Sequence, residues 1–302
     1  MDALPVIGID VGGTKTLAAV VNRRGEVAED ITHPTDVSSQ DALLAGLDKI
    51  VDDLREGRGI AALGFGVPSR VDQRSGRAVA SVNIPLADVD FRDRMRERHG
   101  LPVGIENDAN AATIGEWHAG AARGAQNVVM LTLGTGVGGG LILDGRPFRG
   151  TTGVGAELGH VVIGLDGPPC SCGGHGHLES YAAGPVADRA ARELYGEGSS
   201  GRDLVERGSK GEPEAVEALA AIGRALGAGI ASFVNVFEPE IVVIGGGFGT
   251  AGELLLGPAR EVLAREGLEP ARDTVRIMEA ELGSYAGVIG AGMIAFEALD
   301  AE

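Results

Sequence analysis

The feature that most constrains the fold of this chain is a segment that occurs twice. The sequence VIGIDVGGTKTLAAVVNRRGEV, at residues 6–27, returns in altered form as VVMLTLGTGVGGGLILDGRPF at residues 128–148. In each copy an apolar run meets a glycine-rich turn, a second apolar run follows, and a basic or Asp-Gly turn closes the unit. This pattern predicts one β-hairpin used in two halves of the chain.

The turns of both predicted hairpins carry residues that suit a phosphate group. Glycine lets main-chain N–H groups approach an anion closely, and a threonine hydroxyl adds a donor. Two such turns on duplicated halves predict one nucleotide held between them, with Asp10 positioning Mg²⁺ through water. The nucleotide-binding residues expected from these turns are Asp10, Gly12, Gly13, Thr14, Lys15, Thr135 and Gly136.

A third glycine turn, Gly245-Gly246-Gly247, joins an apolar run to the next predicted helix. A glycine run at such a place often permits only tight packing. Beside two phosphate turns, however, Gly246 and Gly247 are expected to accept the ribose or adenine side of the nucleotide.

Composition narrows the class of protein. With 302 residues and 44% hydrophobic content, the chain is long enough for two modest domains and a sizeable core. The formal net charge of -17 would repel a phosphate backbone, so nucleic acid is not an expected partner. No apolar run approaches the roughly 20 residues that span a bilayer, and no signal peptide precedes the first strand. We therefore expect a cytoplasmic protein without membrane contact.

Hydrophobic spacing predicts alternating helices and strands after the first hairpin. Residues 150–179 interrupt this pattern with glycine, proline, histidine and cysteine, and so long an irregular stretch is either functional or disordered. Its residue types argue against disorder. The predicted helices are Gln40–Arg55, Phe91–His99, from 109 onward, 185–194, 214–236, 253–265 and 286–299, and the further strands are 62–67, 101–106, 241–244 and 274–278.

Asn107 and Asp108 stand where the strand at 101–106 ends and a helix begins. Open α/β sheets place their sites at this position. The alternative is that one of the two residues only caps the helix. Asp108 suits a general base that takes the proton of a sugar hydroxyl as an O–P bond forms, with Asn107 fixing a neighbouring hydroxyl.

Three more polar residues flank the irregular stretch: Glu157, His160 and Glu179. Carboxylates and imidazole are suitable partners for the hydroxyls of a polyol ring. Taken singly, each is as readily explained as a solvated surface residue. Their gathering around one loop favours a sugar site.

The same stretch contains both cysteines of the chain, Cys170 and Cys172. A disulfide between residues so close would be strained, and in a reducing compartment the pair is better explained as metal ligands. Together with His160 and His177 they form a set that suits a structural, tetrahedral Zn²⁺. His175 competes with His177 for the fourth place, and two free thiols are the alternative to a metal site.

Together these motifs resemble the ROK family of sugar kinases in the actin/hexokinase superfamily, and within it the bacterial ATP-dependent glucokinases. The resemblance implies an α/β fold of the hexokinase/ROK type, with duplicated actin-like ATPase (ribonuclease H-like) domains and an interdomain cleft that closes on sugar and ATP. It covers nearly the whole chain and rests on residues 10–14, 106–110, 134–136, 157–160, 170–173, 179 and 245–247.

The resemblance also implies roles for residues. The domains would be residues 1–116, completed by a helix at about 287–302, and residues 117–286, which carry the zinc loop; the assembly would be a homodimer or homotetramer. His160, Cys170 and Cys172 would bind zinc, and Asp108 would be the catalytic base. The sugar-binding residues would be Asn83, Asn107, Asp108, Glu157, His160 and Glu179.

Four positions depart from the common family pattern. His177 stands where many members have a third zinc cysteine, and Ala156 stands where glycine is common before Glu157. Ser69 replaces a usual glycine and Leu86 a frequent tryptophan or glycine, and both bear on the sugar pocket. None of these changes removes a catalytic group.

The function expected on these grounds is Mg-ATP-dependent phosphorylation of a hexose, with glucose as the first choice (glucokinase, EC 2.7.1.2). N-acetylhexosamine, fructose or mannose is the alternative substrate, and polyphosphate is disfavoured as donor because enzymes of that type typically lack the CxCG loop. A sugar sensor or ROK-type repressor is the alternative of a different class. Such repressors add an N-terminal helix-turn-helix. The sequence is expected to lack one, because the residues before the first strand are not enough to build it.

Overall fold

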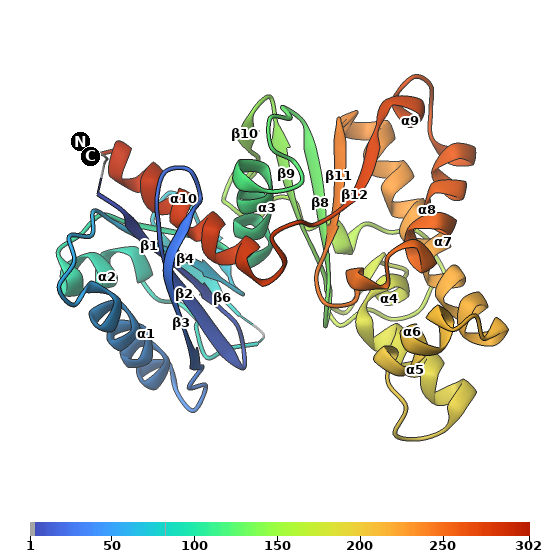
Figure 1. Cartoon of the computed structure of the whole chain (residues 1–302), viewed down its shortest axis with the longest axis horizontal. Helices are drawn as coiled ribbons and strands as arrows, with labels where there is room; N and C mark the ends of the chain where they lie inside the picture. The colour runs from blue at the N-terminus through green and yellow to red at the C-terminus, as the bar shows by residue number, and fades with distance from the viewer. Residues whose placement is uncertain (1–3, 82) are drawn as a thin grey trace. The chain divides into compact units, whose positions relative to one another are not determined.

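The computed structural model describes residues 4–81 and 83–302. Its chain divides into two compact units, each built around a five-stranded sheet (Figure 1). Unit 1 comprises Met1–Gly124, Pro147–Ala156 and Glu281–Glu302, and unit 2 comprises Ala125–Arg146 and Glu157–Ala280. The domain limits expected after residues 116 and 286 stay a prediction.

Unit 1 contains the first copy of the repeated hairpin. Its strands are β1 (Val6–Val11), β2 (Lys15–Val21), β3 (Val27–Pro34), β4 (Leu63–Val67), β5 (Arg70–Asp72), β6 (Arg77–Ala80) and β7 (Val103–Asn107). Its helices are α1 (Gln40–Arg55), α2 (Phe91–His99), α3 (Asp108–Ala119) and α10 (Ala286–Asp300), with a 3₁₀ turn at Gly283–Tyr285. The main sheet has the order β3-β2-β1-β4-β7, in which β1 pairs antiparallel with β2 and β4 pairs parallel with both β1 and β7.

Unit 2 repeats this arrangement. Its strands are β8 (Val128–Leu133), β9 (Val137–Leu143), β10 (Arg146–Pro147), β11 (Ile241–Gly245) and β12 (Arg276–Glu279), in the order β10-β9-β8-β11-β12. Its helices are α4 (Glu179–Ala182), α5 (Gly184–Tyr195), α6 (Gly201–Ser209), α7 (Pro213–Phe237), α8 (Glu253–Glu266) and α9 (Ala271–Thr274), with 3₁₀ turns at Leu158–His160 and Gly249–Ala251. Since β8 is antiparallel to β9 and parallel to β11, the predicted duplication and α/β fold are confirmed.

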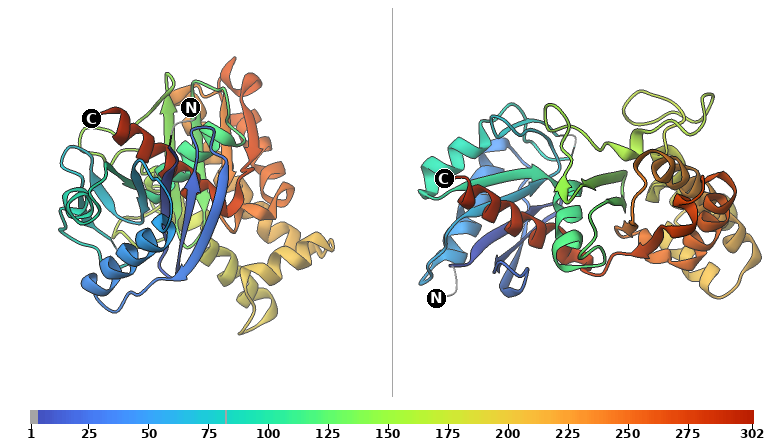
Figure 2. Two further views of the ribbon diagram at one scale, coloured as in Figure 1. Left: turned by 60° about the vertical axis from the view of Figure 1, so that its left-hand side comes forward. Right: turned by 90° about the horizontal axis from the view of Figure 1, so that it is seen from above.

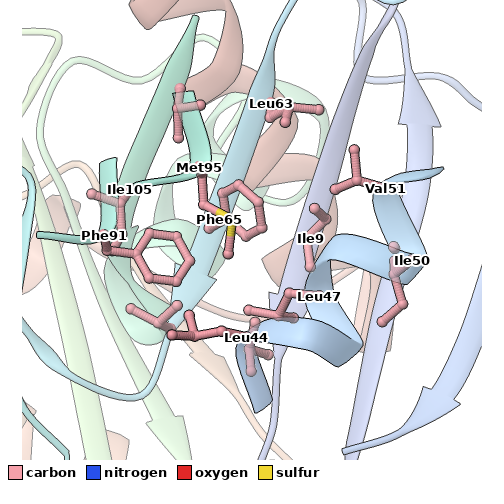
Figure 3. Packing of buried hydrophobic residues seen from close by; sticks show 14 of the residues in the cluster. Ile9, Leu44, Leu47, Ile50, Val51, Leu63, Phe65, Phe91, Met95 and Ile105 are labelled. Carbon is pink, nitrogen blue, oxygen red and sulfur yellow. The ribbon is translucent and has the colours of Figure 1, made fainter. Parts of the chain in front are cut away.

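One face of the unit 1 sheet carries a core of large apolar side chains. Alternate residues of the parallel strands, such as Ile9 and Phe65, point toward helices α1 and α2 (Figure 3). Helix α1 begins at the cap Ser39, whose side chain accepts the N–H of Ala42. The rings of Phe65 and Phe91 meet edge to face with centroids 5.0 Å apart. This apolar face fixes the register of the strands.

The opposite face of the same sheet carries glycine. Gly8, Gly64 and Gly104 are register partners on β1, β4 and β7, so they form one row across the sheet. A methyl group on Gly64 would lie 1.8 Å from the carbonyl oxygen of Ala291 in α10. The row therefore lets the α10 backbone lie directly on the strands, as Figures 1 and 2 show for this unit.

Helix α7 contradicts the expectation that no apolar segment is long enough to span a bilayer. It is 25 residues long and apolar enough to cross a bilayer by length and composition alone. However, 56% of its most apolar window is buried inside the protein, where α7 packs against α8.

The structure also adds elements that the spacing did not predict, among them β3, α4, α6 and α9. The strand expected at 274–278 is shifted, because α9 ends at Thr274 and β12 begins at Arg276. The stretch that was expected to be irregular, residues 150–179, contains the 3₁₀ turn at Leu158–His160 and the isolated antiparallel bridges Val162–His177 and Pro169–His175 before α4 begins.

Candidate functional site

In unit 1 the predicted general base, Asp108, and the residue predicted to position Mg²⁺, Asp10, lie where three parallel strands end. Asp10 on β1 is the register partner of Gly66 on β4, and Gly66 is in turn the partner of Glu106 on β7. A methyl group on Gly66 would lie 3.7 Å from Asp10 Oδ1 and 3.9 Å from the Asp108 Cα atom. The two carboxylates that the sequence placed in different motifs are therefore neighbours.

Asn107 is the N-cap of helix α3. Its Oδ1 atom accepts the N–H groups of Ala109 at 2.9 Å and Asn110 at 3.2 Å. Within the described residues, the hydrogen bond found for its amide nitrogen is a long one of 3.5 Å to the Ser69 carbonyl oxygen. The capping alternative is thus correct as one role of Asn107. Asp108 Oδ1 is a second acceptor for the Ala109 N–H, at 2.9 Å, but the cap is already made by Asn107.

The electrostatics of this strand end favour a neutral Asp10. Burial, and next the nearby negative charge of Asp108, raise the pKa of Asp10 from 3.8 to about 7, and Lys15 partly opposes the shift. The close approach of α10 contributes to this burial, because a methyl group on Gly287 would lie 2.5 Å from the Asp10 carboxyl group. A cation placed beside Asp10 would favour its ionised form.

The raised pKa makes the stability of the ligand-free protein depend on pH. The unfolded chain releases the Asp10 proton near pH 3.8 and the folded protein near pH 7, so the stabilising contribution is complete below 3.8 and is lost as the pH rises through 7. Asp10→Asn cannot ionise. Relative to wild type, its free energy of unfolding is expected to rise by about 2–3 kcal/mol between pH 5 and 8.5, measured by urea unfolding. A difference that is constant with pH would contradict the protonated carboxyl group.

The first glycine turn lies beside this strand end. Its fold is set by Gly12 N–H, which donates to the Lys15 carbonyl oxygen at 3.0 Å, and Gly13, Thr14 and Lys15 are exposed. A methyl group on Gly13 would lie 3.3 Å from the carbonyl oxygen of Asn83. Asn83 thus lies against the predicted phosphate turn, while its neighbour Val82 is outside the described residues.

Two positions that depart from the family pattern have structural partners in unit 1. The Ser69 hydroxyl donates to the Ala80 carbonyl oxygen at 2.9 Å and so closes the β5–β6 hairpin. Leu86 is fully buried in the apolar core. The Ser69 side chain therefore has a hydrogen-bond partner, and the Leu86 side chain packs in the core.

Unit 2 brings its two glycine turns together at one sheet edge. Gly245 of β11 is the register partner of Thr132 of β8, so the turns that follow these strands are neighbours. A methyl group on Gly246 would lie 2.3 Å from the Leu133 carbonyl oxygen, and its φ of 83° also favours glycine. Gly246, Gly247 and Thr135 are exposed, and Gly136 is half-buried.

The four predicted metal ligands come together in unit 2. The ligand atoms of His160, Cys170, Cys172 and His177 all lie within 4.8 Å of one another. Cys172 Sγ is 3.3 Å from His177 Nδ1, and Cys170 Sγ is 3.7 Å from His160 Nδ1. The ligand atoms of a tetrahedral Zn²⁺ are about 3.3–3.8 Å apart, so this donor set fits zinc. His175 is exposed and stands outside the group.

Glu179 contacts both the group of predicted metal ligands and the predicted phosphate turn at residues 134–136. Its Oε2 atom accepts the Val137 N–H at 3.1 Å, and its Oε1 atom accepts the Ser171 hydroxyl at 2.9 Å and contacts Cys170 Sγ at 3.5 Å. A methyl group on Gly136 would lie 2.4 Å from the same carboxylate. The glycine of this turn therefore makes room for the Glu179 carboxylate.

Glu157 is exposed and immediately precedes the 3₁₀ turn at Leu158–His160. Its carbonyl oxygen accepts the His160 N–H at 3.0 Å. Ala156, just before it, has a φ of 65°, a left-handed conformation that costs an alanine about 1–2 kcal/mol. This explains why glycine is common at the position.

Ala156→Gly is expected to raise the free energy of unfolding by up to about 1 kcal/mol, because glycine adopts the left-handed conformation without steric cost but loses more chain entropy on folding. Thermal unfolding would show a higher Tm. In the matched control Ala45→Gly, at an exposed position of helix α1, the same change should lower the stability by about 1 kcal/mol. A lower Tm for Ala156→Gly would contradict the strain.

The sequence did not predict the network behind the strand end. Glu106 is 0% exposed, and its carboxylate binds Gln73 and Arg149, which come from two other parts of unit 1. An acidic residue inside the apolar run of residues 101–106 is the signal that could have identified it.

Comparison with known proteins connects both units to one family. The family described as "ROK family" matches residues 6–298. The glucokinase of Thermotoga maritima is 34% identical over 310 residues, which cover 97% of this chain and 98% of that protein. The xylose repressor of Caldicellulosiruptor bescii is 29% identical, over 96% of this chain and 77% of the repressor. The ROK glucokinase of Streptomyces griseus, solved with glucose and AMPPNP, is 33% identical with a TM-score of 0.84 and covers 97% of this chain and 99% of that one.

Proposed function

Because this chain belongs to the ROK family, we propose that it is a kinase that transfers the γ-phosphoryl group of ATP to the 6-hydroxyl group of glucose. The observation that carries the proposal is the pair of carboxylates, Asp10 and Asp108, at adjacent strand ends beside an exposed glycine turn. The similarity to glucokinases over nearly the full length supports it.

In the proposed reaction Asp108 is the general base. Its carboxylate takes the proton of the sugar O6–H group as the O6–P bond forms and the bond from the γ-phosphorus to the β,γ-bridging oxygen breaks, which releases ADP. Asn107 fixes a neighbouring hydroxyl through its amide nitrogen. The other proposed sugar ligands are Asn83, Glu157, His160 and Glu179.

The nucleotide would be held by main-chain N–H groups. Gly13, Thr14 and Lys15 would face the β- and γ-phosphates on the turn that the Gly12 N–H closes, as would Thr135 and Gly136, while Gly246 and Gly247 would accept the ribose or adenine side. Asp10 is suited to hold Mg²⁺ through water, since a nearby cation favours its ionised form. Mg²⁺ supplies neutralisation of phosphate charge in such reactions.

We propose that His160, Cys170, Cys172 and His177 hold a structural zinc ion. Such an ion would keep the glycine-rich loop ordered and fix the His160 ring, whose Nδ1 atom faces Cys170. The other ring nitrogen would then meet the sugar.

His177→Ala is expected to lower the zinc content from about one ion per chain to nearly none, because three ligands bind the ion far more weakly than a closed set of four. Elemental analysis of the purified protein measures this. His175→Ala is the matched control, since His175 lies two residues away and outside the group. Equal zinc content in both variants would contradict the ligand assignment.

The proposed function is tested by ADP release with Mg-ATP and a panel of glucose, mannose, fructose, N-acetylglucosamine and N-acetylmannosamine. The largest kcat/KM is expected for glucose. Preference for another of these sugars would keep the mechanism and change the substrate. Sugar binding without turnover would instead support a sensor of the repressor type.

The proposal includes a homodimer in the cytoplasm. A dimer is the assembly that the family resemblance favours, and light scattering of the purified protein would measure it. A mass near 30.8 kDa, that of one chain, would contradict it.

A further inference from the structure

Unit 1 contains a fully buried carboxylate that the proposed reaction does not use. Glu106 lies on β7 immediately before Asn107 and Asp108 and is 0% exposed. Its Oε1 atom accepts the Asn107 N–H at 3.0 Å, the Gln73 side-chain amide at 2.9 Å and the Asn110 side-chain amide at 3.3 Å. The carboxylate therefore fixes the backbone where the strand ends.

Arg149 supplies the positive charge that this carboxylate requires. Its Nε atom donates to Glu106 Oε2 at 2.5 Å, and a terminal nitrogen of its guanidinium group donates to Glu297 of α10 at 2.8 Å. Removing the partner of a buried charge costs several kcal/mol because the charge is left uncompensated. The planar guanidinium group can reach two carboxylates at once, which a lysine ammonium group cannot do with the same geometry.

Arg149 belongs to the segment Pro147–Ala156, which we call the strap. The strap is part of unit 1, whereas the residues on both sides of it in the chain belong to unit 2. It is also anchored at Gly153, where a methyl group would lie 2.3 Å from the Val71 carbonyl oxygen of β5. The strap ends immediately before Glu157.

We propose that Arg149 is a positioning residue for sugar binding, which acts on Asn107 through Glu106 and on Glu157 through the strap. The inference rests on the proposed function, in which Asn107 and Glu157 both bind sugar hydroxyls. The glycine turn at residues 12–15 has no hydrogen bond to Arg149 or Glu106 among those found in the described residues. The effect of Arg149 therefore falls on the sugar rather than on ATP.

The test compares Arg149→Met and Arg149→Lys with wild type. Arg149→Met is expected to raise the KM for glucose, and the Kd for glucose from calorimetry without ATP, about 10-fold, while the KM for ATP stays within about threefold. Arg149→Lys keeps the charge but loses the bridge between two acids, so it should raise both glucose constants about threefold. If Arg149→Met does not fold, the measurements on Arg149→Lys still test the inference.

Arg23→Met is the matched control. Arg23 also links another part of unit 1 to α10, by hydrogen bonds to Asp300 at 2.8 and 2.5 Å, but it is remote in the chain from both Asn107 and the strap. Its glucose and ATP constants should be unchanged. The inference would be overturned if the KM and Kd for glucose were unchanged in both Arg149 variants, or if the KM for glucose and the KM for ATP rose equally. In either case, sugar-dependent turnover by the wild-type protein would still uphold the proposed function. A wild-type protein without sugar-dependent turnover would overturn both.

Discussion

Replacing Asp108 with asparagine is expected to lower kcat about 100- to 10,000-fold while the Kd for glucose stays within about threefold. The amide keeps the size of the side chain and its hydrogen-bonding oxygen, but it cannot take the proton of the sugar hydroxyl. Asp108 is placed for this role by the end of β7 and the first turn of α3, which Asn107 caps. Steady-state kinetics and calorimetry without ATP measure the two quantities separately.

Asp93→Asn is the matched control for the loss of one carboxylate. Asp93 also lies in the first turn of a helix, α2, and is exposed. Its variant should have wild-type kcat and KM. Turnover of Asp108→Asn near that of wild type would rule out the role of general base, whereas a large loss of glucose affinity would indicate that Asp108 mainly binds the sugar.

The second large effect is expected at the crossing of helices α3 and α10. A methyl group on Gly290 of α10 would lie 1.7 Å from the Ala111 carbonyl oxygen of α3, and one on Gly115 of α3 would lie 2.1 Å from that of Ala286. Backbone atoms cannot move aside as a flexible side chain can. Gly290→Ala should therefore destabilise the protein by more than about 4 kcal/mol and lower the Tm by about 10 °C or more, as measured by calorimetry.

Gly46→Ala is the matched control, because the same chemical change is expected to stabilise the protein at this position. Gly46 lies within helix α1, and a methyl group there would have no other atom within 4 Å. Alanine favours the helical conformation, so this variant should gain up to about 1 kcal/mol. A Tm of Gly290→Ala close to that of Gly46→Ala would contradict the close contact between helices α3 and α10.

The sequence was sufficient to predict the repeated hairpins because each copy has two apolar runs around a glycine turn. Helix α1 was predicted with its bounds for a similar reason, since Leu43, Leu47 and Leu54 share one face. Strand β3 was not predicted, because it lies at the sheet edge and five of its eight residues are exposed, so its sequence lacks an apolar alternation. Helix α6 could have been found from its capping box, Ser200 and Asp203.

For the candidate site, local motifs predicted which residues matter but not what they touch. The metal group was predicted because its four members lie within 18 positions of one another, from His160 to His177. The partnership of Glu106 with Arg149 joins residues 43 positions apart in the chain and follows only from the folded backbone. The raised pKa of Asp10 likewise depends on burial that Gly287, near the other end of the chain, helps to create.

The glycine row on the unit 1 sheet has a consequence for the order in which the chain matures during synthesis. Strands β1, β4 and β7 leave the ribosome early, but the helix that covers their glycine face, α10, is made after the whole of unit 2. All the residues of unit 2 are available to collapse on their own core while one face of the earlier sheet is still bare. The unit that is begun first is therefore completed last, and the glycine face of its sheet has no covering from α10 until that helix emerges.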